Sequence, residues 1–289
     1  MSENFVRLPV SHYQLSRNYG PGMSSAGGVV EGLRQKTLEK SAGRFGLVLV
    51  HCWNLGEKTG PYPLADNQGM TGTNSDWVIS AGEIIAEKIA PSLGAARETG
   101  IPVFHLASGG YAAKYAQYRK LLDDDELKGP DAGYETRQSI RPVTVEEEWA
   151  EKFGPNWPGP VWETHPDTFD IARPVRPADN EHVVVDGWQL SGLCRRLDID
   201  TLIYAGFMAN VCLLHVPGAM IEMSRKFRYR CVVLRDCTVA HELIATLPNQ
   251  DLTKAAIHYI EFGLGYSTSS HEFIQACQDA RASNTRATS

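Results

Sequence analysis

Short apolar runs that alternate with helix-like segments are the feature that most constrains how this chain can fold. The first run, 45–51, is almost continuously apolar, and four more follow at 101–107, 182–186, 201–206 and 230–235. A run that is apolar at nearly every position is typical of a strand buried on both faces of a parallel sheet. The alternation therefore predicts one α/β domain with three layers, α/β/α, and a mostly parallel, Rossmann-like sheet.

The segments between these runs carry helical patterns. Apolar side chains recur on about one face of 77–99, and Gly100 then provides a stop signal. Four further helices are expected: one that ends at about Leu197, and others at 210–227, 253–262 and 270–280. We expect the helix over 210–227 to kink or break near Pro217, because proline removes an internal hydrogen bond.

Some segments fall outside the alternation. We expect an N-terminal extension over 1–40, a main domain over 41–282 and a disordered tail over 283–289. Segment 55–76 is rich in Gly, Pro, Thr and Asn and is expected to be a long loop. Segment 111–165 carries aromatic residues among acidic runs, and a structureless loop of that length is improbable, so a partly helical insertion is expected. Its role is open between an oligomer contact or surface embellishment and a lid over a substrate pocket.

Composition excludes several classes of function. The 289 residues carry a net charge of −6 without a Lys/Arg run, which argues against a nucleic-acid partner. The longest apolar stretch, 45–50, is too short to cross a bilayer, and the N-terminus has no signal-peptide core. The six cysteines lack CxxC or metal-ligand spacing, so we expect no metal and a reducing compartment. The sequence predicts a soluble, cytoplasmic protein with a small-molecule substrate and no membrane partner.

The segment from Leu202 to His215 is the most informative for chemistry. A buried strand ends at Gly206, a tight turn follows, and Cys212 stands where the next helix begins. Open α/β sheets bind ligands beyond the carboxyl ends of their strands. The free N–H groups of a helix N-terminus favour a thiolate and can hold an oxyanion. Cys212 is therefore a candidate nucleophile, and a small buried hydrophobic side chain is the alternative.

This turn carries a family resemblance. The pattern Gly206-x-x-x-Asn210-x-Cys212, followed by an Arg/Val-rich strand that ends at Asp236, resembles the isochorismatase-like cysteine hydrolases, which include nicotinamidases. The resemblance covers the sheet order from 45 to about 236, without the insertion. It implies a cofactor-independent hydrolase of C–N bonds other than peptide bonds. It also implies a homo-oligomer, a dimer or a tetramer.

The resemblance also implies roles for residues of the turn. Cys212 falls on the family's nucleophile, and the peptide between Phe207 and Met208 falls on its cis bond. The N–H groups of Met208 and Cys212 would then form the oxyanion hole, and Phe207 would contact the substrate.

Two catalytic partners of the family are replaced in this chain. The family's aspartate at the end of the first strand corresponds to His51, and its lysine after the third strand corresponds to Asp186. No lysine occurs between Lys152 and Lys226. The family's mechanism therefore does not transfer as it stands.

Two hypotheses follow, from different classes of function. In the first, His51, Asp186 and Cys212 form a catalytic triad, in which the imidazole deprotonates the thiol and the carboxylate orients the imidazole. In the second, the chain is a catalytically divergent member that binds a ligand or assembles without hydrolysis. A hydrolase of enol ethers, with His51 as the acid, ranks third.

Further candidates flank the expected site. Trp53 and Asn54 follow the first strand and His105 lies in the second, so all three are predicted to contact substrate. Packing is the alternative for Trp53, and a core or strand-end histidine is the alternative for His105. The scattered His51, His105 and His182 give little support to a zinc site.

Overall fold

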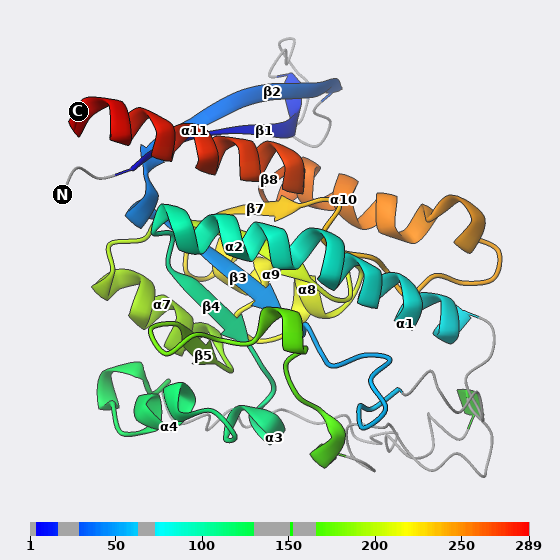
Figure 1. Ribbon diagram of the computed structural model, residues 1–289. Coiled ribbons are helices and arrows are strands. Elements are labelled where there is room, and N and C mark those ends of the chain that lie inside the picture. Colours follow the sequence, from blue (N-terminus) through cyan, green and yellow to red (C-terminus); the bar gives the residue numbers. More distant parts are fainter. Residues whose placement is uncertain (1–3, 17–28, 63–72, 130–150, 153–165, 289) are drawn as a thin grey trace, which may run out of the picture.

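The computed structural model describes residues 4–16, 29–62, 73–129, 151–152 and 166–288 (Figure 1). Within them, one eight-stranded sheet has the strand order β2-β1-β8-β7-β6-β3-β4-β5. Its strands are β1 (Phe5–Ser16), β2 (Val29–Ser41), β3 (Phe45–Val50), β4 (Val103–Leu106), β5 (His182–Val184), β6 (Thr201–Gly206), β7 (Arg230–Leu234) and β8 (Tyr266–Thr268).

Helices connect and cover these strands. The α-helices are α1 (Thr73–Ile84), α2 (Ala90–Thr99), α3 (Gly109–Ala112), α4 (Ala116–Leu122), α7 (Gly187–Arg196), α8 (Cys212–His215), α9 (Met220–Arg225), α10 (Asp251–Gly263) and α11 (Ser270–Thr288). A π-helical turn, η2 (Ile85–Ile89), joins α1 to α2. Short 3-10 turns are η1 (Ala42–Arg44), η3 (Asp125–Leu127), η4 (Pro166–Thr168), η5 (Arg173–Val175) and η6 (Leu247–Asn249).

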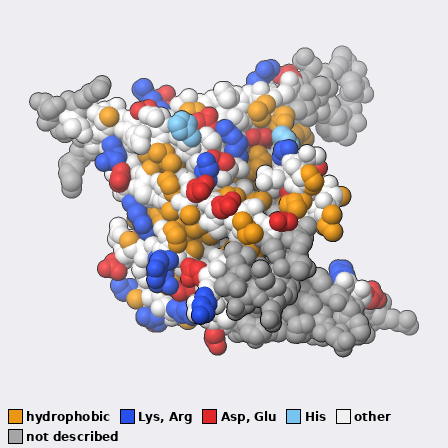
Figure 2. Space-filling view, turned by 45° about the vertical axis from the view of Figure 1, so that its right-hand side comes forward, with side chains coloured by type: hydrophobic (Ala, Val, Ile, Leu, Met, Phe, Trp, Pro, Cys, Tyr) orange, Lys and Arg blue, Asp and Glu red, His pale blue; other side chains and the backbone are white. Residues whose placement is uncertain are grey.

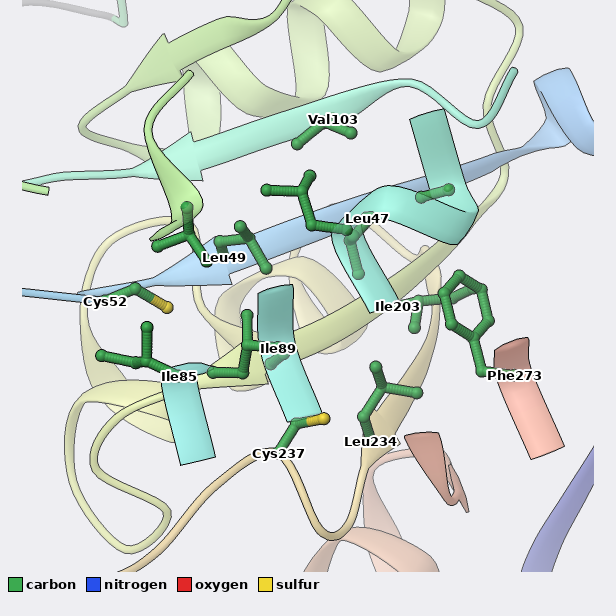
Figure 3. Close-up of a cluster of buried hydrophobic side chains, with 14 of the residues drawn as sticks. Leu47, Leu49, Cys52, Ile85, Ile89, Val103, Ile203, Leu234, Cys237 and Phe273 are labelled. Carbon is green, nitrogen blue, oxygen red and sulfur yellow. The ribbon is translucent and has the colours of Figure 1, made fainter. Parts of the chain in front are cut away.

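The core lies on both faces of the sheet, as strand β3 illustrates. Leu47 and Leu49 pack with α1, α2 and α11, and Figure 3 shows them beside Ile89 of the π-helical turn. Val48 and Val50 pack on the opposite face with α7, α9 and α10. Strands β4, β3, β6 and β7 run parallel to their neighbours. The predicted three-layer α/β/α fold with a mostly parallel sheet is confirmed.

The N-terminal segment holds a structure that the sequence analysis did not predict. Strands β1 and β2 form an antiparallel hairpin that extends the sheet beside β8. Val6, Leu8 and Val10 are buried, whereas the intervening Arg7 and Pro9 are exposed. This alternation is the signal of a half-buried strand. Pro9, which lacks an N–H donor, weakens the sequence signal of this strand.

The C-terminus corrects another expectation. Residues 283–288 were expected to belong to a disordered tail, but α11 continues to Thr288. The helix is held where Asn284 Nδ2 donates to Oδ1 of Asn4, at 2.9 Å. A terminus tied down by contacts with a distant segment can be ordered in spite of its polar composition.

The beginning of segment 111–165 is helical, as expected, in α4 and η3. Tyr111 is buried in the core, and its hydroxyl accepts a hydrogen bond from Trp53 Nε1 at 3.2 Å. Residues 130–150 and 153–165 lie outside the described residues, and so does 63–72 of the expected loop. The lid and the oligomer contact both stay predictions.

On the face shown in Figure 2, basic and acidic side chains are interspersed with hydrophobic ones. Among the described residues, none of the helices combines the length and the apolar character that crossing a membrane requires.

Candidate active site

The carboxyl ends of β3 and β6 bring the candidate site together. The two strands are parallel neighbours, with Val50 opposite Gly206. The N–H of Phe207 donates to the carbonyl of Val50 at 2.9 Å, so His51 follows β3 directly beside the turn. Two residues that are far apart in sequence, His51 and Phe207, therefore lie at adjacent strand ends.

The turn after β6 depends on a glycine. Gly206 has φ +117, and a Cβ at this position would lie 2.0 Å from the carbonyl oxygen of Val50. Only glycine accommodates both this φ and this approach. The N–H of Gly206 donates to Cys237 at 2.9 Å, which ties the turn to the segment after β7. The peptide between Phe207 and Met208 is cis, as expected.

Cys212 differs from the other five cysteines of the chain because it alone is not buried. It is the first residue of α8, which ends after one turn at His215, so the expected break near Pro217 is confirmed. Burial raises the pKa of the Cys212 thiol, and a hydrogen bond with the Met208 backbone opposes that rise. The expected preference for thiolate is wrong, because a single turn carries little dipole and desolvation outweighs it.

His51 is buried at the end of β3, with φ +46. Its ring stacks on Trp53, with centroids 4.8 Å apart and planes 19° from parallel. Burial lowers the pKa of His51 to about 4, so the imidazole is neutral at pH 7 and can accept a proton. Nδ1 of His51 has no hydrogen-bond partner within the described residues.

Asp186 has a structural role in the part of the chain that the structure describes. Its Oδ1 accepts a hydrogen bond from the N–H of Gln189 at 2.8 Å and caps α7. Strand β4 lies between β3 and β5, so the ends of those two strands are about 10 Å apart. No hydrogen bond links His51, Asp186 and Cys212 among the described residues. The triad stays a prediction.

Trp53 and Asn54 hold the chain where it returns after the insertion. Trp53 packs edge-on against Phe169, with centroids 5.0 Å apart. The side chain of Asn54 donates to the carbonyl of Thr168 at 3.1 Å and accepts from the N–H of Asp170 at 2.9 Å. These contacts occupy the polar atoms of Asn54. Its contact with substrate and that of Trp53 stay predictions, as does that of the fully buried Phe207.

His105 belongs to a separate buried ion-pair cluster. Its Nε2 lies 3.0 Å from Oε2 of Glu181, and Arg97 donates to both oxygens of Glu181 at 2.7 and 2.9 Å. Burial alone would raise the pKa of Glu181, but hydrogen bonds from Arg97, His105 and the N–H of Ala178 hold it at about 2. Burial also lowers the pKa of His105. The sequence analysis missed Glu181 and Arg97, whose separation of 84 residues gives no local signal.

Two further polar side chains near the turn escaped the sequence analysis. Trp77 Nε1 and Thr238 Oγ1 are buried and have no hydrogen-bond partner in the described residues. Trp77 packs near His241, with ring centroids 6.3 Å apart, and the N–H of His241 donates to Oδ1 of Asn210 at 3.3 Å. Thr238 follows Cys237, which bonds to Gly206. Buried polar atoms without a partner are uncommon in folded proteins, and an ordered water, an ion or a functional role accounts for such atoms.

The described residues do not include a ready set of metal ligands. No group of three or more His, Cys, Asp or Glu side chains among them is arranged to hold a metal ion.

Comparison with known proteins finds similarity among solved structures. Neither models of protein families nor curated proteins give a match. The chain is similar to a cysteine hydrolase from Pseudomonas syringae pv. phaseolicola 1448A, with 15% identity and a TM-score of 0.47, over 83% of this chain and 94% of that one. An isochorismatase family protein from Desulfovibrio vulgaris subsp. vulgaris str. Hildenborough has 17% identity and a TM-score of 0.44, over 83% and 98%.

A nicotinamidase from Staphylococcus aureus is more distant, with 13% identity and a TM-score of 0.39, over 78% of this chain and 99% of that one. The solved structures that this chain is similar to are thus isochorismatase-family cysteine hydrolases and nicotinamidases.

Proposed function

We propose that this protein is a cysteine hydrolase that cleaves an amide or a related C–N bond of a small molecule, with Cys212 as the nucleophile. One observation carries the proposal. Cys212 is the one cysteine that is not buried, it lies beyond the carboxyl end of β6, and the Met208 backbone hydrogen-bonds to its thiol. A nucleophile needs this combination of access and of a nearby N–H group for the developing oxyanion.

The first half of the reaction forms a thioester. His51 takes the proton of the Cys212 thiol, and the sulfur attacks the carbonyl carbon of the substrate. The N–H groups of Met208 and Cys212 hold the oxyanion of the tetrahedral intermediate. The C–N bond then breaks, and the protonated His51 gives its proton to the departing nitrogen.

The second half releases the acid. His51, neutral again, takes a proton from a water molecule, whose oxygen attacks the thioester carbonyl. The C–S bond breaks, and the proton on His51 returns to the Cys212 sulfur. One amide and one water have become one carboxylic acid and one amine or ammonia, and the enzyme is unchanged.

The raised pKa of the Cys212 thiol and the lowered pKa of His51 both oppose the proton transfer that the attack requires. The Cys212 thiol is protonated at neutral pH, because burial raises its pKa, so the attack requires proton removal. His51 is neutral above pH about 4 and can serve as that base. Its stacking on Trp53 restrains the ring. We propose that Asp186 assists its orientation, which Asp186→Asn would test.

A panel of small aromatic and aliphatic primary amides tests the proposal by ammonia release. We expect turnover of at least one amide by the wild type and a loss of about 1000-fold or more in Cys212→Ser. Cys277→Ala, which removes a buried thiol of α11, is the matched control and should retain turnover. Equal ammonia release by Cys212→Ser and the wild type would refute the nucleophile.

A second candidate function is ligand binding without hydrolysis. It is favoured by the missing hydrogen bond between Cys212 and His51 in the described residues and by the raised pKa of the thiol. Amides that bind without releasing ammonia or forming a covalent adduct would support this candidate.

A further inference from the structure

A cavity lies at the ends of the strands opposite to those that hold Cys212. It has a volume of about 380 Å³ and is lined by residues at the amino ends of β7 and β8, in β1 and at the end of α10. Pockets for small molecules begin at about this size. Neither Cys212 nor His51 lines it. Any ligand in this cavity is therefore distinct from the substrate of the proposed hydrolase.

Two arginines give this cavity its charge. Arg228 and Arg230 both line it, and among the described residues neither side chain has an acidic partner or a hydrogen bond. Glu261 is the one acid among the lining residues, and its Oε1 already accepts from Ser267 Oγ at 2.6 Å. Lys36 adds a positive charge nearby, where its Nζ donates to the Tyr266 hydroxyl at 2.7 Å. The cavity is thus cationic in a chain whose net charge is −6.

Aromatic rings form another part of the wall. His12, Tyr13 and Tyr266 line the cavity, and the rings of His12 and Tyr266 pack edge-on, with centroids 5.4 Å apart. Nδ1 of His12 is buried and has no hydrogen-bond partner in the part of the chain that the structure describes. Such an atom is costly unless something satisfies it.

We propose that this cavity binds a small aromatic phosphate. Two guanidinium groups can hold the oxygens of a phosphate by paired, charge-assisted hydrogen bonds and match its double negative charge. The aromatic wall would pack against the ring of the same ligand. Because β1 supplies His12 and Tyr13, the N-terminal hairpin is part of the binding site.

Isothermal titration calorimetry at low salt, with phenyl phosphate as the probe, tests this proposal. We expect one site per chain, and weaker binding of inorganic phosphate and of benzoate, which each lack one half of the ligand. Arg228→Gln and Arg230→Gln should each weaken phenyl phosphate about 10-fold or more, since a hydrogen bond to a charged group is lost. Arg228→Lys keeps the positive charge but loses the paired hydrogen bonds of the guanidinium group. Its affinity for phenyl phosphate should therefore lie between those of the wild type and Arg228→Gln.

Arg173→Gln is the matched control, because Arg173 is an exposed arginine outside the cavity. Its affinity for phenyl phosphate should stay within about twofold of the wild type. The arginines have no partners in the described fold, so thermal unfolding without ligand should be unchanged in all variants. Three results would overturn the proposal: no binding of phenyl phosphate at millimolar concentration, equal weakening by Arg173→Gln, or equal affinity for inorganic phosphate.

Discussion

The Glu181 carboxylate and the strand ends around His51 both include buried polar atoms, but only the carboxylate has all of its atoms bonded, since Nδ1 of the neighbouring His105 also lacks a partner among the described residues. Both oxygens of Glu181 receive hydrogen bonds, from Arg97, from His105 and from a backbone N–H. Near the turn, by contrast, Nδ1 of His51 and the polar atoms of Trp77 and Thr238 have no partner among the described residues.

The difference distinguishes buried polar groups that stabilise the fold from buried polar groups that we expect to serve function. A buried polar group that is fully bonded stabilises the fold, whereas one left open costs free energy that an ordered water or a ligand recovers. Substitutions in the Glu181 cluster should therefore lower the free energy of unfolding, whereas substitutions at the strand ends around His51 should leave the fold intact. Substitutions around His51 should lower amide turnover, whereas substitutions in the Glu181 cluster should leave it unchanged.

The largest effect is expected at Cys212. Cys212→Ser should lower amide turnover by about 1000-fold or more while the free energy of unfolding changes by no more than about 1 kcal/mol. The half-buried thiol contributes little packing that serine does not replace. Amide turnover and urea unfolding of the same variant measure the two quantities. A loss of activity that merely followed a loss of folded protein would break the comparison.

The pH dependence of stability should report His51. Folding lowers its pKa from about 6.5 to about 4, so between these values the unfolded chain binds the proton more readily. Above pH 6.5 the contribution of His51 to stability does not change with pH. As the pH drops from 6.5 to about 4, the free energy of unfolding falls by up to about 3 kcal/mol. His51→Gln should lose this part of the dependence, measured by urea unfolding across that range. Identical pH profiles of wild type and variant would contradict the buried, neutral His51.

The pH dependence of amide turnover should also reflect the lowered pKa of His51. Because neutral His51 is the proposed base, the acidic limb of kcat/KM should lie near pH 4 rather than near 6.5.

Glu181→Gln should destabilise the fold by about 2 kcal/mol at pH 7, because it leaves Arg97 and His105 without their anion. Arg97 is partly exposed, so the destabilisation should be smaller than for a fully buried ion pair. The wild-type contribution is present above pH about 4.5 and is lost as the pH falls towards about 2, where Glu181 is protonated. Urea unfolding measures the loss, and turnover of the folded variant should match that of the wild type.

Thr238→Val should have the smallest effect and the opposite sign. It removes a buried hydroxyl that lacks a partner and keeps the shape of the side chain, so stability should be unchanged or rise by about 1 kcal/mol. Thermal unfolding of Thr238→Val beside Glu181→Gln compares the two regions directly. A large destabilisation by Thr238→Val would mean that its hydroxyl is satisfied, and the distinction between the regions would fail.

The sequence predicted the parts of the structure that carry local signals. The apolar runs of β3, β6 and β7 have the near-continuous pattern of buried parallel strands, and the strand that ends at Gly206 places Cys212 beyond its carboxyl end. Local pattern suffices there, because burial on both faces leaves few alternatives.

Other features depend on contacts that no local pattern encodes. Arg97 meets Glu181 across 84 residues, and the end of α11 is ordered by Asn4 at the other end of the chain. The raised pKa of Cys212 follows from the partial burial of the thiol, which the motif does not specify. The cap of α7 by Asp186 was hidden for a similar reason, since the same carboxylate suits a cap and a catalytic partner.

Acyl transfer from p-nitrophenyl acetate to the protein tests the central claim most directly. After a short incubation and an acid quench, peptide mass spectrometry would locate and quantify the acetyl group. The account predicts rapid acetylation at Cys212, slowed at least about 10-fold in His51→Gln because the base is gone. Acetylation of Cys212 at the same rate in wild type and His51→Gln, or none at Cys212, would contradict it.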